Sequence, residues 1–146
     1  IERAMARFLS LQKTLAEGAG AAGLAAVLAD PQRFAGKRVG LVLCGGNIDP
    51  RLAASIMMRQ LAREQRIIAI RITIVDRPGV LGDIADTIGA RDGNILEVQH
   101  LRTLLSVPAK GACVDVTIET HGPQHAQEII AALRERGHRV DRLDPP

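Results

Sequence analysis

The stretch "RIIAIRITIVD", residues 66–76, alternates strictly along its length. Every second residue is an isoleucine, and these form one side: Ile68, Ile70, Ile72 and Ile74. The intervening positions are mixed: Ala69, Arg71, Thr73 and Val75. Residues two apart share a face of a strand, and one apolar face beside a mixed one is typical of a sheet covered on one side. We therefore expect a half-buried strand here.

The residues that follow predict the other elements of a small α/β domain, residues 67–146. A helix is expected next, with Leu81, Ile84, Ala85 and Ile88 on its inner face. A strand follows in "NILEVQHLRTLL" (94–105), with a bulge at Gly93-Asn94. The chain continues with a loop "VPAKG" (107–111), a strand "ACVDVTIET" (112–120), a helix "GPQHAQEIIAALRERG" (122–137) and a short strand "HRVDRL" (138–143). This order predicts a ferredoxin-like βαββαβ fold with both helices on one face of an antiparallel sheet.

The first part of the chain, residues 1–64, has a different pattern. Helices are expected in "ERAMARFLSLQ" (2–12), "EGAGAAGLAAVLAD" (17–30) and "DPRLAASIMMRQLARE" (49–64), the last with Asp49 as N-cap and Pro50 at its first position. "KRVGLVLC" (37–44) is expected to be a buried strand. One strand cannot close a sheet, so we expect this part to be the end of a larger α/β domain, with a boundary near Glu64 to Arg66. The chain starts at Ile1 in what looks like mid-helix, so an excised piece of a longer protein is expected.

Composition excludes several classes of function. The 146 residues are 47% apolar but only 1% aromatic, with a formal charge of +3. The arginines are scattered, and no aromatic cluster could stack on bases, so we expect no nucleic-acid partner. Cys44 and Cys113 lack zinc-site spacing, and Gly122 and Pro123 separate His121 from His125, so no metal is expected. No stretch is long and apolar enough to span a membrane, and we expect a cytoplasmic protein.

"DRPGVLGDIADTI" (76–88) resembles the first turn and helix of ACT domains, which are small regulatory modules that bind amino acids, and "GNI" (93–95) resembles the start of their second strand. The resemblance implies an effector site at the turn: Asp76, Pro78, Gly79, Val80 and Leu81, with Asn94 and Ile95 completing it. The residues around the turn are aliphatic, so we expect isoleucine or valine as effector. ACT domains commonly pair, which implies a homo-oligomer with the site across its interface. A turn that binds nothing is the alternative.

"AEGAGAAGLAAVL" (16–28) and "VGLVLCGGNIDP" (39–50) resemble the end of the catalytic domain in fold-type II pyridoxal-phosphate enzymes, and most closely threonine ammonia-lyases. The resemblance implies that Cys44 faces the pyridine nitrogen of the cofactor and that Glu17 lies near the ring. Gly45 and Gly46 would let the chain pass the ring edge, and Asn47 would fix the turn. The order of the two parts matches threonine ammonia-lyases with one C-terminal ACT domain.

The segments that hold the cofactor in that family are not in this sequence. Lys13, Lys37 and Lys110 are the lysines of the chain, and none lies in an S-F-K-x-R-like context. We therefore expect no catalytic residue and no dehydratase activity in this chain alone. "GAGAAG" (18–23) matches a dinucleotide-binding pattern, but no strand precedes it. Two alternatives remain: a stand-alone ACT-type module with residues 1–64 as a scaffold, and part of a serine dehydratase or racemase.

Overall fold

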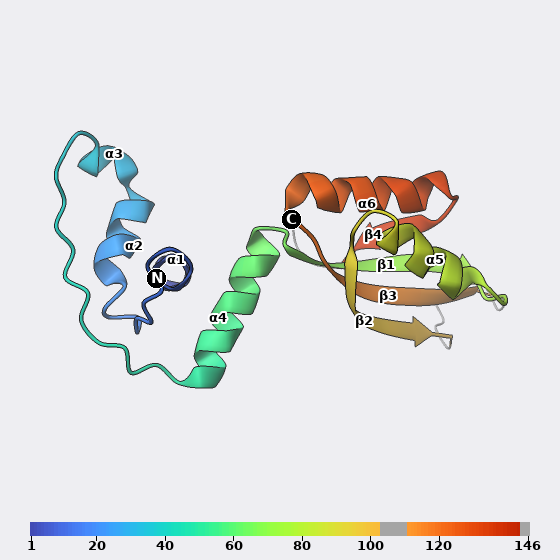
Figure 1. Cartoon of the computed structure of the whole chain (residues 1–146), viewed down its shortest axis with the longest axis horizontal. Coiled ribbons are helices and arrows are strands. Elements are labelled where there is room, and N and C mark those ends of the chain that lie inside the picture. The colour runs from blue at the N-terminus through green and yellow to red at the C-terminus, as the bar shows by residue number, and fades with distance from the viewer. Residues whose placement is uncertain (103–110, 144–146) are drawn as a thin grey trace. The chain divides into compact units, whose positions relative to one another are not determined.

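The computed structural model describes residues 1–102 and 111–143. The chain folds as two compact units, Ile1–Gln60 and Leu61–Pro146 (Figure 1). The expected boundary at Glu64 to Arg66 lies just after this division.

The second unit is built on a four-stranded sheet with strand order β2-β3-β1-β4. Its elements follow each other as β1 (Ile67–Val75), α5 (Val80–Gly89), β2 (Asn94–Leu101), β3 (Gly111–Glu119), α6 (Pro123–Glu135) and β4 (Arg139–Arg142). Each pair of neighbouring strands is antiparallel. Both helices lie on the same face of the sheet (Figure 1). The ferredoxin-like βαββαβ prediction is confirmed.

The core of this unit lies between the isoleucine face of β1 and the two helices. Ile68, Ile70 and Ile72 are fully buried, and they lie opposite Ile118, Val116 and Val114 of β3. The helices contribute aliphatic side chains to the same cluster: Ile84, Ile88, Ala126, Ile129, Ile130 and Leu133. The alternation in residues 66–76 was therefore a correct guide to the buried face.

Leu81 was wrongly expected on the inner face of α5, because it is 41% exposed. α5 begins at Val80, which is buried and forms an inward stripe with Ile84, Thr87 and Ile88. These positions follow the i, i+4, i+7, i+8 spacing of one helix face, and Leu81 falls beside that stripe.

The expected bulge in β2 lies further along than Gly93-Asn94. The register shifts between Ile95 and Glu97. Gly93 has a different role, because a Cβ there would lie 2.8 Å from Ile88 Cγ2 and 2.9 Å from Ile129 Cδ1. The glycine lets the chain pass close to both helices. The residues expected to extend this strand to Leu105, and most of the expected loop at 107–111, lie outside the described residues.

The face of the sheet away from the helices is centred on an ion pair. Arg71 donates to Asp115 through Nε (2.7 Å to Oδ1) and Nη2 (2.6 Å to Oδ2). This hydrogen bond, together with the carboxylate charge, raises the pKa of the Arg71 guanidinium. Val75, on the same face, is 65% exposed.

The first unit is mainly helical, with α1 (Glu2–Gln12), α2 (Ala22–Ala29), α3 (Pro31–Phe34) and α4 (Pro50–Arg63). Its buried cluster is small: Ala4, Met5, Ala16, Ala21 and Ile56. Asp49 Oδ1 accepts a hydrogen bond from Leu52 N at 2.9 Å, so the predicted N-cap of α4 is confirmed. α2 begins just after Gly18 to Gly20, through which the helix was expected to be entered, and ends at Ala29, directly before Asp30 and Pro31.

The strand expected at residues 37–44 is wrong. These residues form no regular element, and Val42 is 84% exposed. A strand needs a neighbour to satisfy its backbone groups, and residues 1–60 contain no other strand. An apolar composition alone therefore does not produce a strand here.

Candidate functional site

The turn between β1 and α5 is open around Gly79. Gly79 has a φ of +89°, in the left-handed region that favours glycine. Among the described residues, no atom beyond its chain neighbours lies within 4 Å of the place that a Cβ would occupy. The backbone therefore requires glycine, and the space beside it is accessible to a ligand.

A hollow of about 370 Å³ adjoins this turn, and residues from β2 complete its lining. Asp76 Oδ2 accepts a hydrogen bond from Arg102 Nε at 2.9 Å. His100 Nε2 lies 3.7 Å from the other carboxylate oxygen of Asp76. No sequence pattern connects His100 and Arg102 with the turn, because only the folded sheet brings the end of β2 and the residue after it beside the turn.

The first residues of α5, Val80 and Leu81, line this hollow. The hydrogen bond from Val80 N to Arg77 O is long, at 3.5 Å. Amides at the start of a helix attract anions, since the helix dipole is positive there. Of these two lining residues, Leu81 has an exposed side chain.

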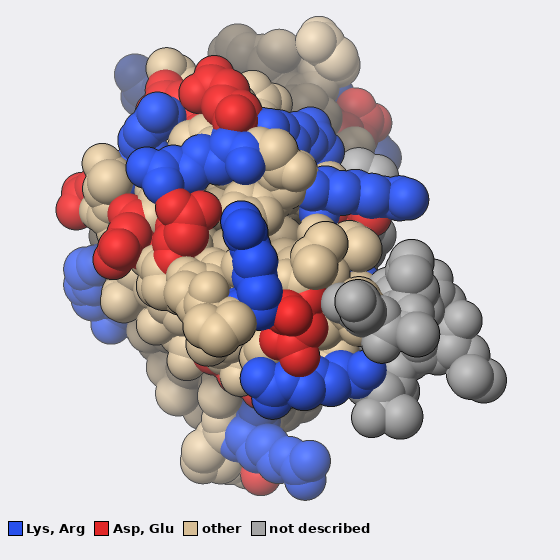
Figure 2. All heavy atoms as spheres, turned by 90° about the vertical axis from the view of Figure 1, so that its right-hand side faces the viewer, with Lys and Arg blue, Asp and Glu red and all other residues tan. Residues whose placement is uncertain are grey.

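The first turn of α5 is also tied to the end of α6. Asp83 pairs with Arg136 and lies 3.2 Å from His138 Nε2. The hydrogen bond from His138 and the charge of Arg136 hold the pKa of the Asp83 carboxyl below its usual value, against a smaller opposing effect of burial. Figure 2 faces this end of the unit and shows basic and acidic side chains interleaved over it.

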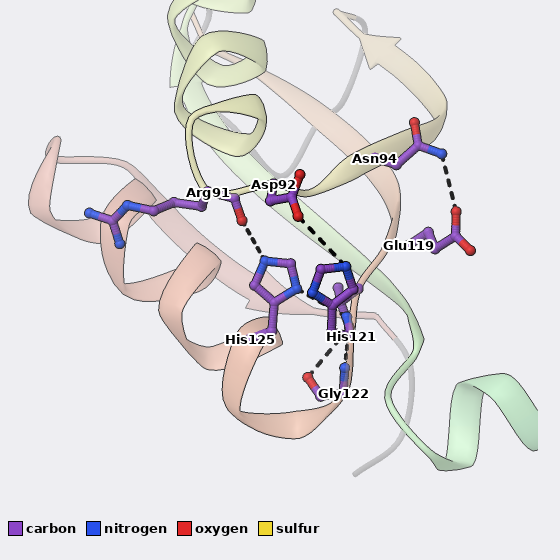
Figure 3. Close-up of polar contacts among 8 residues, drawn as sticks. Arg91, Asp92, Asn94, Glu119, His121, Gly122 and His125 are labelled. Atoms are coloured by element: carbon purple, nitrogen blue, oxygen red, sulfur yellow. Dashed lines mark hydrogen bonds and ion pairs between the residues drawn. The ribbon is translucent and has the colours of Figure 1, made fainter.

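Asn94 and Ile95 lie at the opposite end of the sheet. Asn94 is opposite Glu119, which also pairs with Ile67 at the start of β1, whereas the turn follows the end of β1. Asn94 Nδ2 donates to Glu119 Oε2 at 3.1 Å (Figure 3), and Ile95 packs against the core. One chain therefore does not bring Asn94 to the turn, and completing the site with Asn94 requires a second copy.

His125 has a structural role that sequence reasoning missed. Its Nδ1 accepts a hydrogen bond from the backbone N–H of His121 at 3.0 Å, and its Nε2 lies 2.5 Å from the carbonyl oxygen of Arg91 (Figure 3). These partners place the ring proton on Nε2. The rings of His121 and His125 stack, with centroids 4.6 Å apart. His125 thus connects the start of α6 to the turn before β2.

Within residues 1–102 and 111–143, no three His, Cys, Asp or Glu side chains are grouped so that they could hold a metal ion. In the same part of the chain, no helix has both the length and the apolar character that crossing a membrane requires.

In the first unit, the segment starting at Glu17 lies against the glycine loop Cys44 to Gly46. Glu17 N donates to Gly45 O at 3.2 Å. A Cβ on Gly45 would collide with the Glu17 carboxylate, and one on Gly20 would collide with the Cys44 carbonyl. The structure therefore brings Glu17 together with Cys44, Gly45 and Gly46. Asn47, the next residue of the loop, is exposed. Cys44 is also exposed.

Comparisons with solved structures give distant likenesses. A prephenate dehydratase from Staphylococcus aureus subsp. aureus Mu50 matches with a TM-score of 0.46 and 18% identity, over 53% of this chain and 29% of that chain. An unknown protein from Galdieria sulphuraria matches with a TM-score of 0.41 and 13% identity, over 56% of this chain and 46% of that chain. The fold assignment rests on the strand order alone.

Sequence comparison gives closer relatives, although no family model matches the chain. An L-threonine ammonia-lyase from Thermotoga maritima is 36% identical over 90% of this chain, and one from Geobacter sulfurreducens is 36% identical over 98%. The chain spans only 33% and 36% of the lengths of these proteins. In sequence, this chain is therefore a relative of the C-terminal part of the L-threonine ammonia-lyases.

Proposed function

We propose that the second unit is an ACT-type regulatory domain that binds isoleucine or valine, and that the chain forms the C-terminal part of a pyridoxal-phosphate-dependent threonine ammonia-lyase. The parent enzyme would convert L-threonine to 2-oxobutanoate and ammonia. The observation that carries the proposal is the open turn at Gly79, on a ferredoxin-like sheet, in a relative of these enzymes.

The chemistry of the turn suits an aliphatic amino acid. The amides of Val80 and Leu81 can donate to a carboxylate, and the long bond from Val80 N to Arg77 O is easily exchanged for one to a ligand. The aliphatic residues Ile74, Val80 and Leu81 line the same hollow. Each buried methylene adds about 0.8 kcal/mol, which favours isoleucine and valine over alanine.

A second copy of the chain would complete the site. β2 is an edge strand, and Leu96 and Val98 on it are 47% and 40% exposed. Antiparallel pairing of two β2 strands about a two-fold axis would bring Asn94 of one copy to the Leu101 end of the other, beside its turn. The Asn94 amide can both donate and accept hydrogen bonds, which suits a ligand with two charges.

We propose that the glycine loop of the first unit lies along one edge of a pyridoxal-phosphate ring in the parent enzyme. Cys44 would face the ring nitrogen, Gly45 and Gly46 would let the backbone pass the ring, and Glu17 would lie beside it. The cofactor supplies the electron sink for the carbanion of the reaction. No lysine of this chain has the context needed to bind the cofactor, so the chain alone is proposed to be inactive.

Calorimetric titration of the chain with isoleucine and valine tests the regulatory proposal. We expect binding that is lost in Gly79→Leu, because the side chain would fill the open space and oppose the positive φ, and that is weakened in Asn94→Ala. Gly36→Leu is the matched control, since Gly36 also has a positive φ and open surroundings but lies in the first unit. If none of the twenty amino acids at millimolar concentration gives heat or shifts the melting temperature, the turn is only structural.

A further inference from the structure

We propose that Asp76, Arg102 and His100 form a seat for an amino-acid zwitterion, in which Asp76 takes the ammonium group while Arg102 and His100 join the helix-start amides at the carboxylate. This inference rests on the proposed function and deepens it, because it names the groups that recognise the two charges.

The ion pair between Asp76 and Arg102 is one that a ligand can readily replace. Arg102 Nε and Asp76 Oδ2 are 2.9 Å apart, but the Arg102 side chain is 63% exposed and the Asp76 side chain is 35% exposed. Exposed ion pairs contribute little to stability. A zwitterion inserted between the two side chains offers each of them an opposite charge, so one exposed pair is exchanged for two contacts.

His100 contributes a buried ring nitrogen to this site. Its Nε2 atom is buried and has no hydrogen-bond partner among the described residues, with Asp76 Oδ1 at 3.7 Å as an ion-pair contact only. Most buried polar atoms in proteins have a partner. His100 lines the same hollow as Asp76 and Arg102, so a ligand carboxylate held by Arg102 lies within reach of this nitrogen.

The arrangement makes a prediction about specificity. Asp76 comes from the turn after β1, whereas His100 lies near the end of β2 and Arg102 directly follows that strand. The ligand therefore has to bridge two elements with two charges. A 2-oxo acid lacks the ammonium group, and a simple amine lacks the carboxylate, so each should lose one half of the seat.

The test compares three ligands of similar shape by calorimetry on the whole chain: isoleucine, 3-methyl-2-oxopentanoate and 2-methylbutylamine. The wild-type chain should prefer isoleucine to both others by tenfold or more. Asp76→Asn should abolish the preference over the oxo acid, and Arg102→Gln should abolish the preference over the amine. Arg102→Lys, which keeps the charge, should retain binding to within a few fold.

The matched control is Arg59→Gln. Arg59 pairs with Glu2 at 3.1 Å, with side chains that are 63% and 33% exposed, and its loss should leave all three affinities unchanged. Isoleucine binding that survives both Asp76→Asn and Arg102→Gln overturns the zwitterion seat and leaves the regulatory proposal intact. A wild-type chain that binds no amino acid overturns the regulatory proposal and the seat together.

Discussion

His125 is held in a single tautomer by two backbone partners, the N–H of His121 and the carbonyl of Arg91. Both partners lie in turns, where backbone groups have no strand or helix neighbour to pair with. The imidazole therefore satisfies a donor and an acceptor that the main chain would otherwise leave to water.

Replacing this side chain should cost measurable stability. A typical intramolecular hydrogen bond contributes about 0.5–1.5 kcal/mol, so His125→Ala should lower the free energy of unfolding by about 1–2 kcal/mol in urea titrations. His121→Ala is the control: it removes the stacked ring but keeps the backbone N–H, and should cost less than about 0.5 kcal/mol. Equal losses in the two variants would contradict the role given to His125.

Single residues were predictable where the reason was local. The N-cap formed by Asp49 depends only on the residues that follow it. The turn around Gly79 depends only on the backbone conformation of that glycine. His125 and Gly93 were missed because their partners come from other elements. Asn94 was assigned to the same site by resemblance, but no sequence pattern shows that the sheet places it at the end opposite the turn.

Among the elements, β1 is a central strand whose isoleucines belong to the core of the second unit. It lies between β3 and β4, and its isoleucines face both helices. Its opposite face carries the Arg71–Asp115 pair and the exposed Val75.

The two faces of β1 should therefore respond differently to truncation. Ile72→Ala should lower the free energy of unfolding by about 2–5 kcal/mol, since it leaves a cavity at a fully buried site. Val75→Ala, at a site that is 65% exposed, should change it by less than about 0.5 kcal/mol. Chemical denaturation of both variants measures the difference, and similar costs would show that the open face is covered in solution.

The elements predicted correctly are those whose period identifies a buried face, such as β1 and α6. The prediction of a strand at residues 37–44 was wrong because it relied on hydrophobicity alone, whereas a strand depends on a partner elsewhere in the chain. The position of the bulge in β2 failed for a related reason, since the glycine that suggested it is required by packing against Ile88 and Ile129.

For the whole molecule, the two units differ in the size of their cores. The second unit has a continuous aliphatic cluster. The buried cluster of the first unit consists of a few alanines together with Met5 and Ile56. Because each cluster is confined to its own unit, the chain should unfold in two steps, with the first unit melting first.

Scanning calorimetry can assign these steps. Ile56→Ala should lower the midpoint temperature of the earlier transition only, and Ile72→Ala that of the later transition only. The expected shift is roughly 4–8 °C for each kcal/mol of stability lost in a domain of this size. A single transition that both substitutions shift equally would show that the two units unfold as one.

The antiparallel pairing of β1 with β3 also has a consequence during synthesis, because β1 is made well before β3. Ile72 meets Val114 only after roughly forty more residues have been made, and ribosomes add about 5–20 residues per second. For several seconds, a nascent strand of alternating isoleucines therefore has no β3 to cover it. Pairings so distant along the chain also slow folding in general. The central strand of the finished sheet is therefore open to aggregation during synthesis.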